Sequence, residues 1–353
     1  MDLAETYLST LKERMLKHGV PETSGYGGLE TLLNEVGAQL KPSIVKTVIH
    51  ARGGPGEGIA DGAFFTKEEF KDRPDDTLLM EHALGRQPKR GQMEVKGIDE
   101  DLDRTAQSPQ IKKYLDAVPF LLLTNYWDFR MLSRDDLGRT VEGERFTLAD
   151  SADAFRAAIR QSKKLAGEKG ARLVEFLKRA LLHEAPLDSP KDVAWYLASY
   201  AREALGRLDE HADAAHLGQL KLALEEALGL KFEGEGGEHF FRSSLVQTLF
   251  YGIFAAWVLW AAEQGRGDKD RFDWRLTDHY LHVPAIQTIY RQVSDPRKLK
   301  PLQLEPVLAW TGEVLNRVVK EKFFAKFQQE HAVQYFYEPF LQAFDPDLRK
   351  QLG

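Results

Sequence analysis

The chain has 353 residues, of which 43% are hydrophobic and 29% charged, a composition typical of soluble globular proteins with room for two or three domains. It contains no cysteine, which excludes disulfides, thiolate zinc sites and cysteine nucleophiles and favours a cytoplasmic protein. The formal net charge of −6 counts against a protein that coats nucleic acid, but it is compatible with a nuclease, whose site must itself be acidic to hold a metal.

The N-terminal part is predicted to begin with two helices. Residues 2–18 repeat apolar side chains with helical spacing, and a second amphipathic helix follows a break at residues 21–28 and ends near Gly37. The first residues lack the basic and apolar regions of a signal peptide, so we expect none.

Three short strands are predicted next, at residues 43–49, 59–65 and 92–96. A turn rich in glycine and proline separates the first two, and a charged, partly helical surface excursion over residues 67–86 separates the second from the third. Because strand side chains alternate between two faces, Met93 and Val95 should point to one side. Glu94 and Lys96 should then share the other side, which we expect to be exposed.

The acidic run at residues 99–103 is interpreted as a mobile loop over the site, with cation binding as the alternative. A short helix over residues 108–115 and an apolar strand over residues 120–125, buried on both faces, should follow. We then expect an edge strand at residues 128–134, a turn at residues 136–138 and a last short strand at residues 145–148. Together these elements predict an α/β domain that covers residues 1–149.

Residues 150–353 are predicted to form an all-helical domain, because strand patterns nearly vanish there. The apolar run at residues 245–262 has the length of a membrane span, but it contains Gln247 and Thr248 and is flanked by charges. We therefore expect a buried core helix and no association with a membrane. The expected helices span residues 152–166, 171–184, 191–209, 219–228, 239–264, 283–293 and 306–327, before an aromatic segment at 332–344.

Asp61, Glu94 and Lys96 have the side chains that metal-dependent phosphodiester hydrolysis requires. Two carboxylates on neighbouring strands, with the carbonyl oxygen of Val95 as a further ligand, suit Mg²⁺, with Mn²⁺ as the alternative. A lysine beside the metal can orient the attacking water or stabilise charge that develops on the phosphate. An ordinary solvated strand pair and a turn aspartate are the alternatives.

The helix at residues 108–115 adds a second group of candidates. Gln110 and Tyr114 are four residues apart and therefore share one helix face, where Gln110 could position the metal site or the DNA backbone. Hydrogen bonding of Gln110 within its own helix is the alternative. Lys112, Lys113 and Tyr114 are the predicted contacts to DNA.

The chain resembles the PD-(D/E)xK nuclease superfamily in four features: Asp61, the Glu94-Val95-Lys96 strand, the Gln-x-x-x-Tyr helix and the apolar strand. Ala60 stands where proline is usual. The stretches SGYGGL, GQMEVKG, SPQIKKYL and LLLTNYWDFRML resemble one subgroup, the N-terminal nuclease domains of single-chain, Type IIG-like restriction–modification enzymes and related phage-defence proteins. The resemblance implies a restriction-endonuclease-like fold, with a central mixed sheet flanked by helices. It also implies Mg²⁺-dependent hydrolysis of double-stranded DNA.

In this superfamily a helix before the sheet often supplies another acid, for which Glu30 and Glu35 are the candidates. They are five residues apart and so point in different directions. For either residue, a solvated position on the helix surface is the alternative.

The second half resembles the helical connector that precedes an N6-adenine methyltransferase in such enzymes, through QTLFYGIFAA and YFYEPFL. The chain has no Asn-Pro-Pro-Tyr tetrad and no glycine-rich S-adenosylmethionine loop. The resemblance therefore implies methyltransferase and target-recognition domains in cis or in trans, S-adenosylmethionine bound only there, and Gly353 as the boundary of a longer chain. A homodimer is expected where two strands are cut.

Two other functional hypotheses stay open. The first is a catalytically inactive nuclease fold that binds DNA or scaffolds a methyltransferase. The second is a latent nuclease that cleaves only together with those missing domains.

Overall fold

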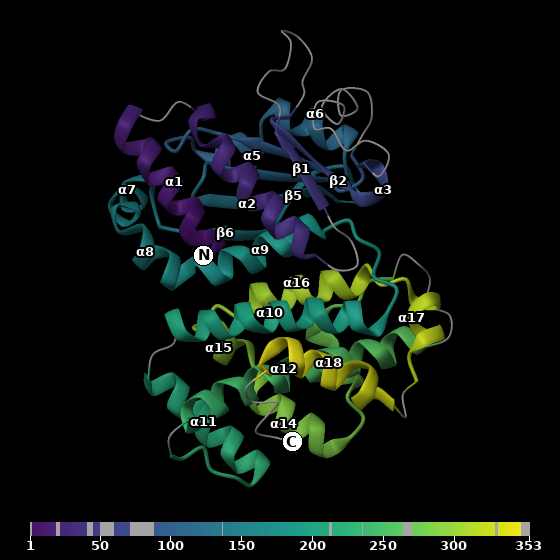
Figure 1. Ribbon diagram of the computed structural model, residues 1–353. Helices are drawn as coiled ribbons and strands as arrows, with labels where there is room; N and C mark the ends of the chain where they lie inside the picture. Colours follow the sequence, from purple (N-terminus) through teal and green to yellow (C-terminus); the bar gives the residue numbers. More distant parts are fainter. Residues whose placement is uncertain are drawn as a thin grey trace. The chain divides into compact units, whose positions relative to one another are not determined.

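The computed structural model describes residues 2–18, 22–40, 45–49, 60–70, 88–135, 137–211, 214–234, 236–263, 270–328 and 331–346. The chain divides into two compact units, Met1–Ala185 and Pro186–Gly353 (Figure 1). The expected boundary at residues 149 and 150 lies earlier than this division. Helices α8 (Ser162–Leu165) and α9 (Ala171–Leu181) follow the expected boundary, but they contact α1 (Leu3–His18) and α2 (Tyr26–Gln39) and belong to the first unit.

The first unit contains the expected mixed sheet. Its order along the sheet is β1-β2-β3-β4-β5-β6, and β3 and β4 are parallel, whereas every other neighbouring pair is antiparallel. Helices cover both faces, which is the arrangement expected for an α/β domain. The strands are β1 (Val45–Ile49), β2 (Gly62–Thr66), β3 (Gln92–Val95), β4 (Phe120–Thr124), β5 (Asp128–Arg134) and β6 (Thr140–Thr147).

The predicted strands at residues 92–96 and 120–125 agree with β3 and β4 within one residue. The prediction that β5 lies at an edge was wrong, because β5 pairs with β4 on one side and with β6 on the other. β6 begins at Thr140 instead of Arg145, since its polar first half forms a hairpin with β5 that no hydrophobic alternation signals. The predicted turn rich in glycine and proline at residues 53–56 lies outside the described residues, as do the predictions for residues 21, 43, 44, 59, 71–86, 136 and 264.

A β-bulge in β6 divides its acidic side chains between the two faces of the sheet. Arg130 pairs with Arg145 and Leu132 pairs with Glu142, so two residues of β6 lie opposite one of β5. As a result Glu142 contacts Arg130 on one face of the sheet. Glu144 contacts the buried Arg179 of α9 (Ala171–Leu181) on the other face.

Helix α2 covers the free edge of β1 and takes the place of a further strand. The side-chain amide of Asn34 donates to the Thr47 carbonyl at 2.9 Å and accepts from the Thr47 N–H at 2.8 Å. One turn earlier, the Glu30 carboxylate accepts from the Ile49 N–H at 3.1 Å. Exposed strand edges invite pairing with other chains, and these contacts satisfy that edge internally. A glycine is required at Gly37, where a Cβ would lie 2.0 Å from the Val45 carbonyl oxygen.

Helices α5 (Leu102–Ala106) and α6 (Pro109–Ala117) cover one face of the sheet. Leu102 and Ile111 pack there against Leu121, Leu123 and Leu132 of the sheet. Helix α6 begins where Ser108 caps the Ile111 N–H and proline occupies the first turn, a favoured start.

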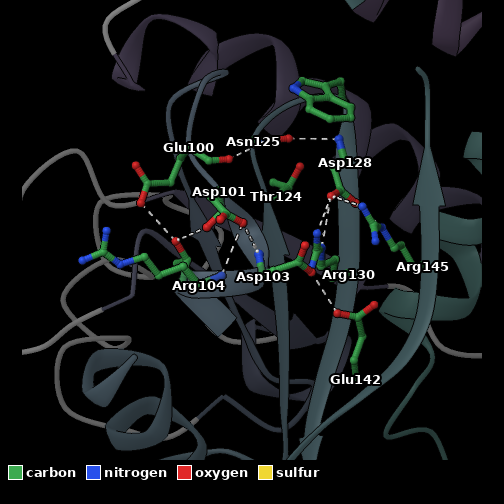
Figure 2. Close-up of polar contacts among 12 residues, drawn as sticks. Glu100, Asp101, Asp103, Arg104, Thr124, Asn125, Asp128, Arg130, Glu142 and Arg145 are labelled. Carbon is green, nitrogen blue, oxygen red and sulfur yellow. Dashed lines mark hydrogen bonds and ion pairs between the residues drawn. The ribbon is translucent and has the colours of Figure 1, made fainter. Parts of the chain in front are cut away.

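The predicted acidic loop at residues 99–103 is a turn only as far as Asp101, because helix α5 begins at Leu102. Asp101 caps α5 by accepting from the N–H groups of Asp103 and Arg104. Asp103 forms an ion pair with Arg130 (Figure 2), and Asp99 forms one with Arg156 of α7 (Ala152–Ala158). Each of these three acids therefore has a hydrogen-bond or ion-pair partner within the chain.

The helices after β6 complete the first unit. The predicted helix at residues 152–166 is divided by a 3₁₀ turn, and Phe176 of α9 packs on Phe129 and Phe146 of the sheet. The elements are α7 (Ala152–Ala158), η2 (Ile159–Gln161), α8 (Ser162–Leu165), the π-helical turn η3 (Ala166–Gly170) and α9 (Ala171–Leu181).

The second unit is helical in the residues that the structure describes, apart from one isolated bridge between Leu187 and Val318. That bridge explains why the helix predicted over residues 306–327 is split into α16 and α17, since the chain between them lies extended beside Leu187. The main helices are α10 (Pro190–His211), α11 (Ala214–Leu228), α12 (Gly237–Ala262), α14 (Pro284–Ser294), α16 (Glu305–Asn316), α17 (Lys320–Lys326) and α18 (Glu338–Phe344).

Helix α12 forms the centre of the second unit. By length and hydropathy it could cross a membrane, but 61% of its most apolar window is buried inside the structure. Phe254 stacks on Phe336 and Trp257 packs on Phe323, so its aromatic side chains contact neighbouring helices. This burial agrees with the expected core helix.

Candidate functional site

The candidate site lies where β3 ends, and its side chains alternate as predicted. Met93 and Val95 are fully buried, and Glu94 and Lys96 contact each other. The expectation of an exposed face was wrong, because the Glu94 side chain is only 2% exposed and that of Lys96 18%. Helix α6 covers this face, so the carboxylate lies in a largely desolvated environment.

Asp61 reaches the same end of β3. The last antiparallel pairs of β2 and β3 join Gly62 to Met93 and Ala63 to Gln92, so one further step of this register places Asp61 opposite Glu94. There the ladder ends, and the Asp61 carboxylate accepts a hydrogen bond of 2.8 Å from the Val95 N–H. The two acids that are far apart in the sequence are therefore neighbours.

Lys96 and Gln110 hold the Glu94 carboxylate. The Lys96 ammonium group lies 2.5 Å from Oε1 of Glu94, and the Gln110 amide donates to the same oxygen at 3.0 Å. Gln110 also donates to the Tyr114 hydroxyl at 2.8 Å, as expected for side chains four residues apart on one helix face. The alternative in which Gln110 only stabilises its own helix does not account for its bond to Glu94.

The electrostatics of the site favour protonation of Glu94. Burial and the nearby Asp61 carboxylate raise the pKa of Glu94 from 4.5 to about 7, although Lys96 acts in the opposite direction. Burial and the negative charge of Glu94 also raise the pKa of the Tyr114 hydroxyl. Two carboxylates that repel each other in a desolvated place would be stabilised by a cation, so the donor set fits a hard metal ion.

Within the described residues, no group of three or more histidine, cysteine, aspartate or glutamate side chains forms a metal-binding cluster. The candidate site supplies two acids, Asp61 and Glu94. Mg²⁺ is commonly held by one or two carboxylates and keeps several waters, so two acids are sufficient for it.

The predicted DNA contacts separate into two kinds. Lys112 and Lys113 are exposed on α6, as a contact to phosphates requires. Tyr114 is 3% exposed and bonded to Gln110, so its expected contact with DNA is not supported. The tyrosine instead lies inside the candidate site, beside Glu94.

The two candidate extra acids also differ. Glu30 binds the N–H of Ile49, whose partner in β2 is Gly62, and it therefore lies at the same end of the sheet as Asp61. Glu35 is exposed and lines a groove between α1 and α2 together with Thr10 and Thr31. Only Glu30 is placed near the candidate site.

The turn between β4 and β5 adjoins the site, although the residues predicted for the site did not include it. The Lys96 N–H donates to the Thr124 carbonyl at 2.7 Å, so the last residue of β4 holds the backbone of the lysine. The Asn-Tyr-Trp-Asp sequence between two strands signals such a turn, because asparagine readily caps its own backbone two or three residues on.

Comparisons of the chain with models of known families, with characterised proteins and with solved structures gave no match.

Proposed function

We propose that this chain is the Mg²⁺-dependent endonuclease part of a restriction–modification or phage-defence system, with double-stranded DNA as its substrate. The observation that carries the proposal is the convergence of Asp61, Glu94 and Lys96 at one sheet end, with Gln110 bonded to Glu94. A restriction-endonuclease-like fold would account for this arrangement, and the mixed sheet is compatible with it.

Each residue would have a defined task. Asp61, Glu94 and the Val95 carbonyl oxygen would hold Mg²⁺, which polarises a phosphate and lowers the pKa of a bound water. Lys96 would orient the attacking water or stabilise charge on the phosphate, and Gln110 would keep the Glu94 carboxylate in place. Lys112 and Lys113 would bind DNA phosphates without reading sequence.

The charges of Asp61, Glu94 and Lys96 suit a site that is completed when a cation binds. In the described structure the Lys96 ammonium group partly compensates the repulsion between Asp61 and Glu94. A bound cation would take over that compensation, and Lys96 would become available to the water or the phosphate. The Lys96–Glu94 ion pair would therefore belong to the metal-free state.

Burial of Glu94 also favours a second function, in which the nuclease fold binds DNA or scaffolds a methyltransferase without cleaving. A carboxylate that is 2% exposed and paired with Lys96 could be structural. Methyltransferase and target-recognition domains would then be the working partners, as they would also be for a latent nuclease.

The test is cleavage of supercoiled plasmid DNA in Mg²⁺ by the wild type and by Asp61→Ala, Glu94→Ala and Lys96→Ala. We expect each substitution to abolish cleavage while thermal unfolding remains cooperative. Asp153→Ala, at a residue 95% exposed on α7, is the matched control and should cleave normally. Full cleavage by Glu94→Ala would exclude the proposed site, and DNA binding without cleavage under every condition would favour the scaffold.

A further inference from the structure

The loop that leaves β3 is held by two side chains from the turn between β4 and β5. The indole N–H of Trp127 donates to the Ile98 carbonyl at 3.0 Å, and the amide of Asn125 donates to the Glu100 carbonyl at 3.2 Å. Figure 2 shows Asn125 between Glu100 and Asp128. Both carbonyls belong to the segment that directly follows Lys96, so these two bonds set the direction in which the chain leaves the candidate site.

The turn itself has little conformational freedom. Tyr126 is fully buried and has a φ of 78°, in the left-handed region that a bulky side chain rarely adopts. The Tyr7 hydroxyl donates to the Tyr126 carbonyl at 2.9 Å, and a Cβ at Gly25 would lie 2.3 Å from the tyrosine ring. The surrounding side chains thus impose a strained backbone conformation, as is common close to functional sites.

Side chains within the turn fix its two ends. The Tyr126 N–H donates to the Thr124 hydroxyl at 3.0 Å, and the Asp128 N–H donates to the Asn125 side-chain carbonyl at 3.0 Å. The buried Asp128 carboxylate is in turn bound by Arg130 at 2.9 Å and by Arg145 at 2.8 Å (Figure 2). The donors of Asn125 and Trp127 are therefore held in place before the loop after β3 packs on them.

We propose that Asn125 and Trp127 are positioning residues of the candidate nuclease site, which hold the loop after β3 so that the Lys96 ammonium group stays within the site, beside Glu94 in the Mg²⁺-free protein. Neither side chain touches the reacting atoms, and each acts through the backbone at Ile98 and Glu100. This inference rests on the proposed function for its effect on cleavage, but its structural part can be tested without cleavage.

Two substitutions remove the donors and keep the rest of the turn. Trp127→Phe retains a ring to pack on Phe155 but loses the indole N–H, and Asn125→Ser retains an oxygen for the Asp128 N–H but cannot reach Glu100. Trp274→Phe is the matched control, because its indole N–H has no hydrogen-bond partner in the part of the chain that the structure describes.

The first measurement is the single-turnover rate constant for plasmid cleavage in saturating Mg²⁺, together with DNA affinity and the thermal midpoint. We expect a loss of about 10–100-fold in the rate constant, since small displacements of catalytic groups have effects of this size. DNA affinity should stay unchanged, and Trp274→Phe should cleave at the wild-type rate. A purely structural role would lower the thermal midpoint but leave the rate constant of the folded fraction unchanged, and that result would overturn the inference.

The second measurement observes Lys96 directly. Its ammonium signal in a ¹H–¹⁵N spectrum of the Mg²⁺-free protein, assigned by its loss in Lys96→Met, should be protected from solvent exchange in the wild type. We expect this protection to be lost in Trp127→Phe and in Asn125→Ser, and its retention in both would overturn the inference. A wild type that shows the protected signal but never cleaves DNA would contradict the proposed function alone.

Discussion

The Asp61 carboxylate accepts a hydrogen bond of 2.8 Å from the backbone N–H of Val95. This contact closes the β2–β3 ladder with a side chain where the next backbone pair would stand, and it brings the acid beside Glu94. Asp61 therefore neighbours a buried carboxylate 33 residues away (94 − 61), as the sequence predicts for two acids on adjacent strands, and not as the alternative of a turn aspartate would require.

Stability of the Mg²⁺-free protein should fall as pH rises through the pKa of Glu94. This pKa is about 7 in the folded protein against an ordinary value of 4.5, so the folded state binds the proton more tightly than the unfolded state. The contribution is complete below about pH 4.5 and is lost as pH rises through about 7. Urea unfolding across this range should show the decrease in the wild type and a weaker one in Glu94→Gln, and equal pH dependences would contradict the assignment.

The same linkage predicts that added Mg²⁺ stabilises the protein more at pH 8 than at pH 6, because the cation competes with the proton on Glu94. Thermal midpoints measured with and without Mg²⁺ at both pH values test this. Glu94→Gln is the control and should gain little at either pH. An equal gain in the wild type and in this variant would place the cation elsewhere.

Substitution of the two candidate extra acids should have different consequences. Glu30→Ala removes the acceptor of the Ile49 N–H beside the site, so we expect lower cleavage and a loss of about 1–3 kcal/mol in the free energy of unfolding. Glu35→Ala, at an exposed position, should change neither quantity. Plasmid cleavage and urea unfolding measure both effects, and a selective loss of cleavage in Glu35→Ala would contradict the placement of the site.

Tyr114 and the lysines of α6 should affect different kinetic quantities. Tyr114→Phe removes the acceptor of the Gln110 amide, so the cleavage rate should fall while DNA affinity stays unchanged. Lys112→Ala and Lys113→Ala should each weaken DNA binding. Each should also reduce the slope of log K against the logarithm of the salt concentration by about one. Filter binding at several salt concentrations separates the two classes, and a loss of affinity in Tyr114→Phe alone would restore its role as a DNA contact.

Arg179 and Glu144 form a buried ion pair in which each charge neutralises the other, so removal of either side chain should destabilise the protein. The two side chains are 1% and 3% exposed and are joined by hydrogen bonds of 3.0 Å from Nε to both carboxylate oxygens. Arg179→Met or Glu144→Met would leave an uncompensated buried charge, at a cost of about 3–5 kcal/mol. The double substitution with Met at both positions should cost less than either single one in urea unfolding. An additive loss would show that the two residues act independently.

Local sequence patterns were sufficient to predict much of the secondary structure around the candidate site. The alternation of Met93, Glu94, Val95 and Lys96 fixed which side chains share a face of β3, because strand geometry has a period of two. The four-residue spacing of Gln110 and Tyr114 likewise fixed their contact on one helix face. These predictions depend on neighbouring residues, and no distant contact is needed to make them.

Which of these faces is buried, and which side chains lie together there, depends on contacts between distant segments of the chain. The position of α6 over Glu94 depends on contacts between separate elements of the chain. The same is true of β5, which lies in the interior of the sheet because it pairs with both β4 and β6. The strained turn at Tyr126 exists because Tyr7 and Gly25, more than a hundred residues earlier, surround it. Local propensity cannot encode such contacts, since the free energy that selects them comes from packing and from hydrogen bonds between distant segments.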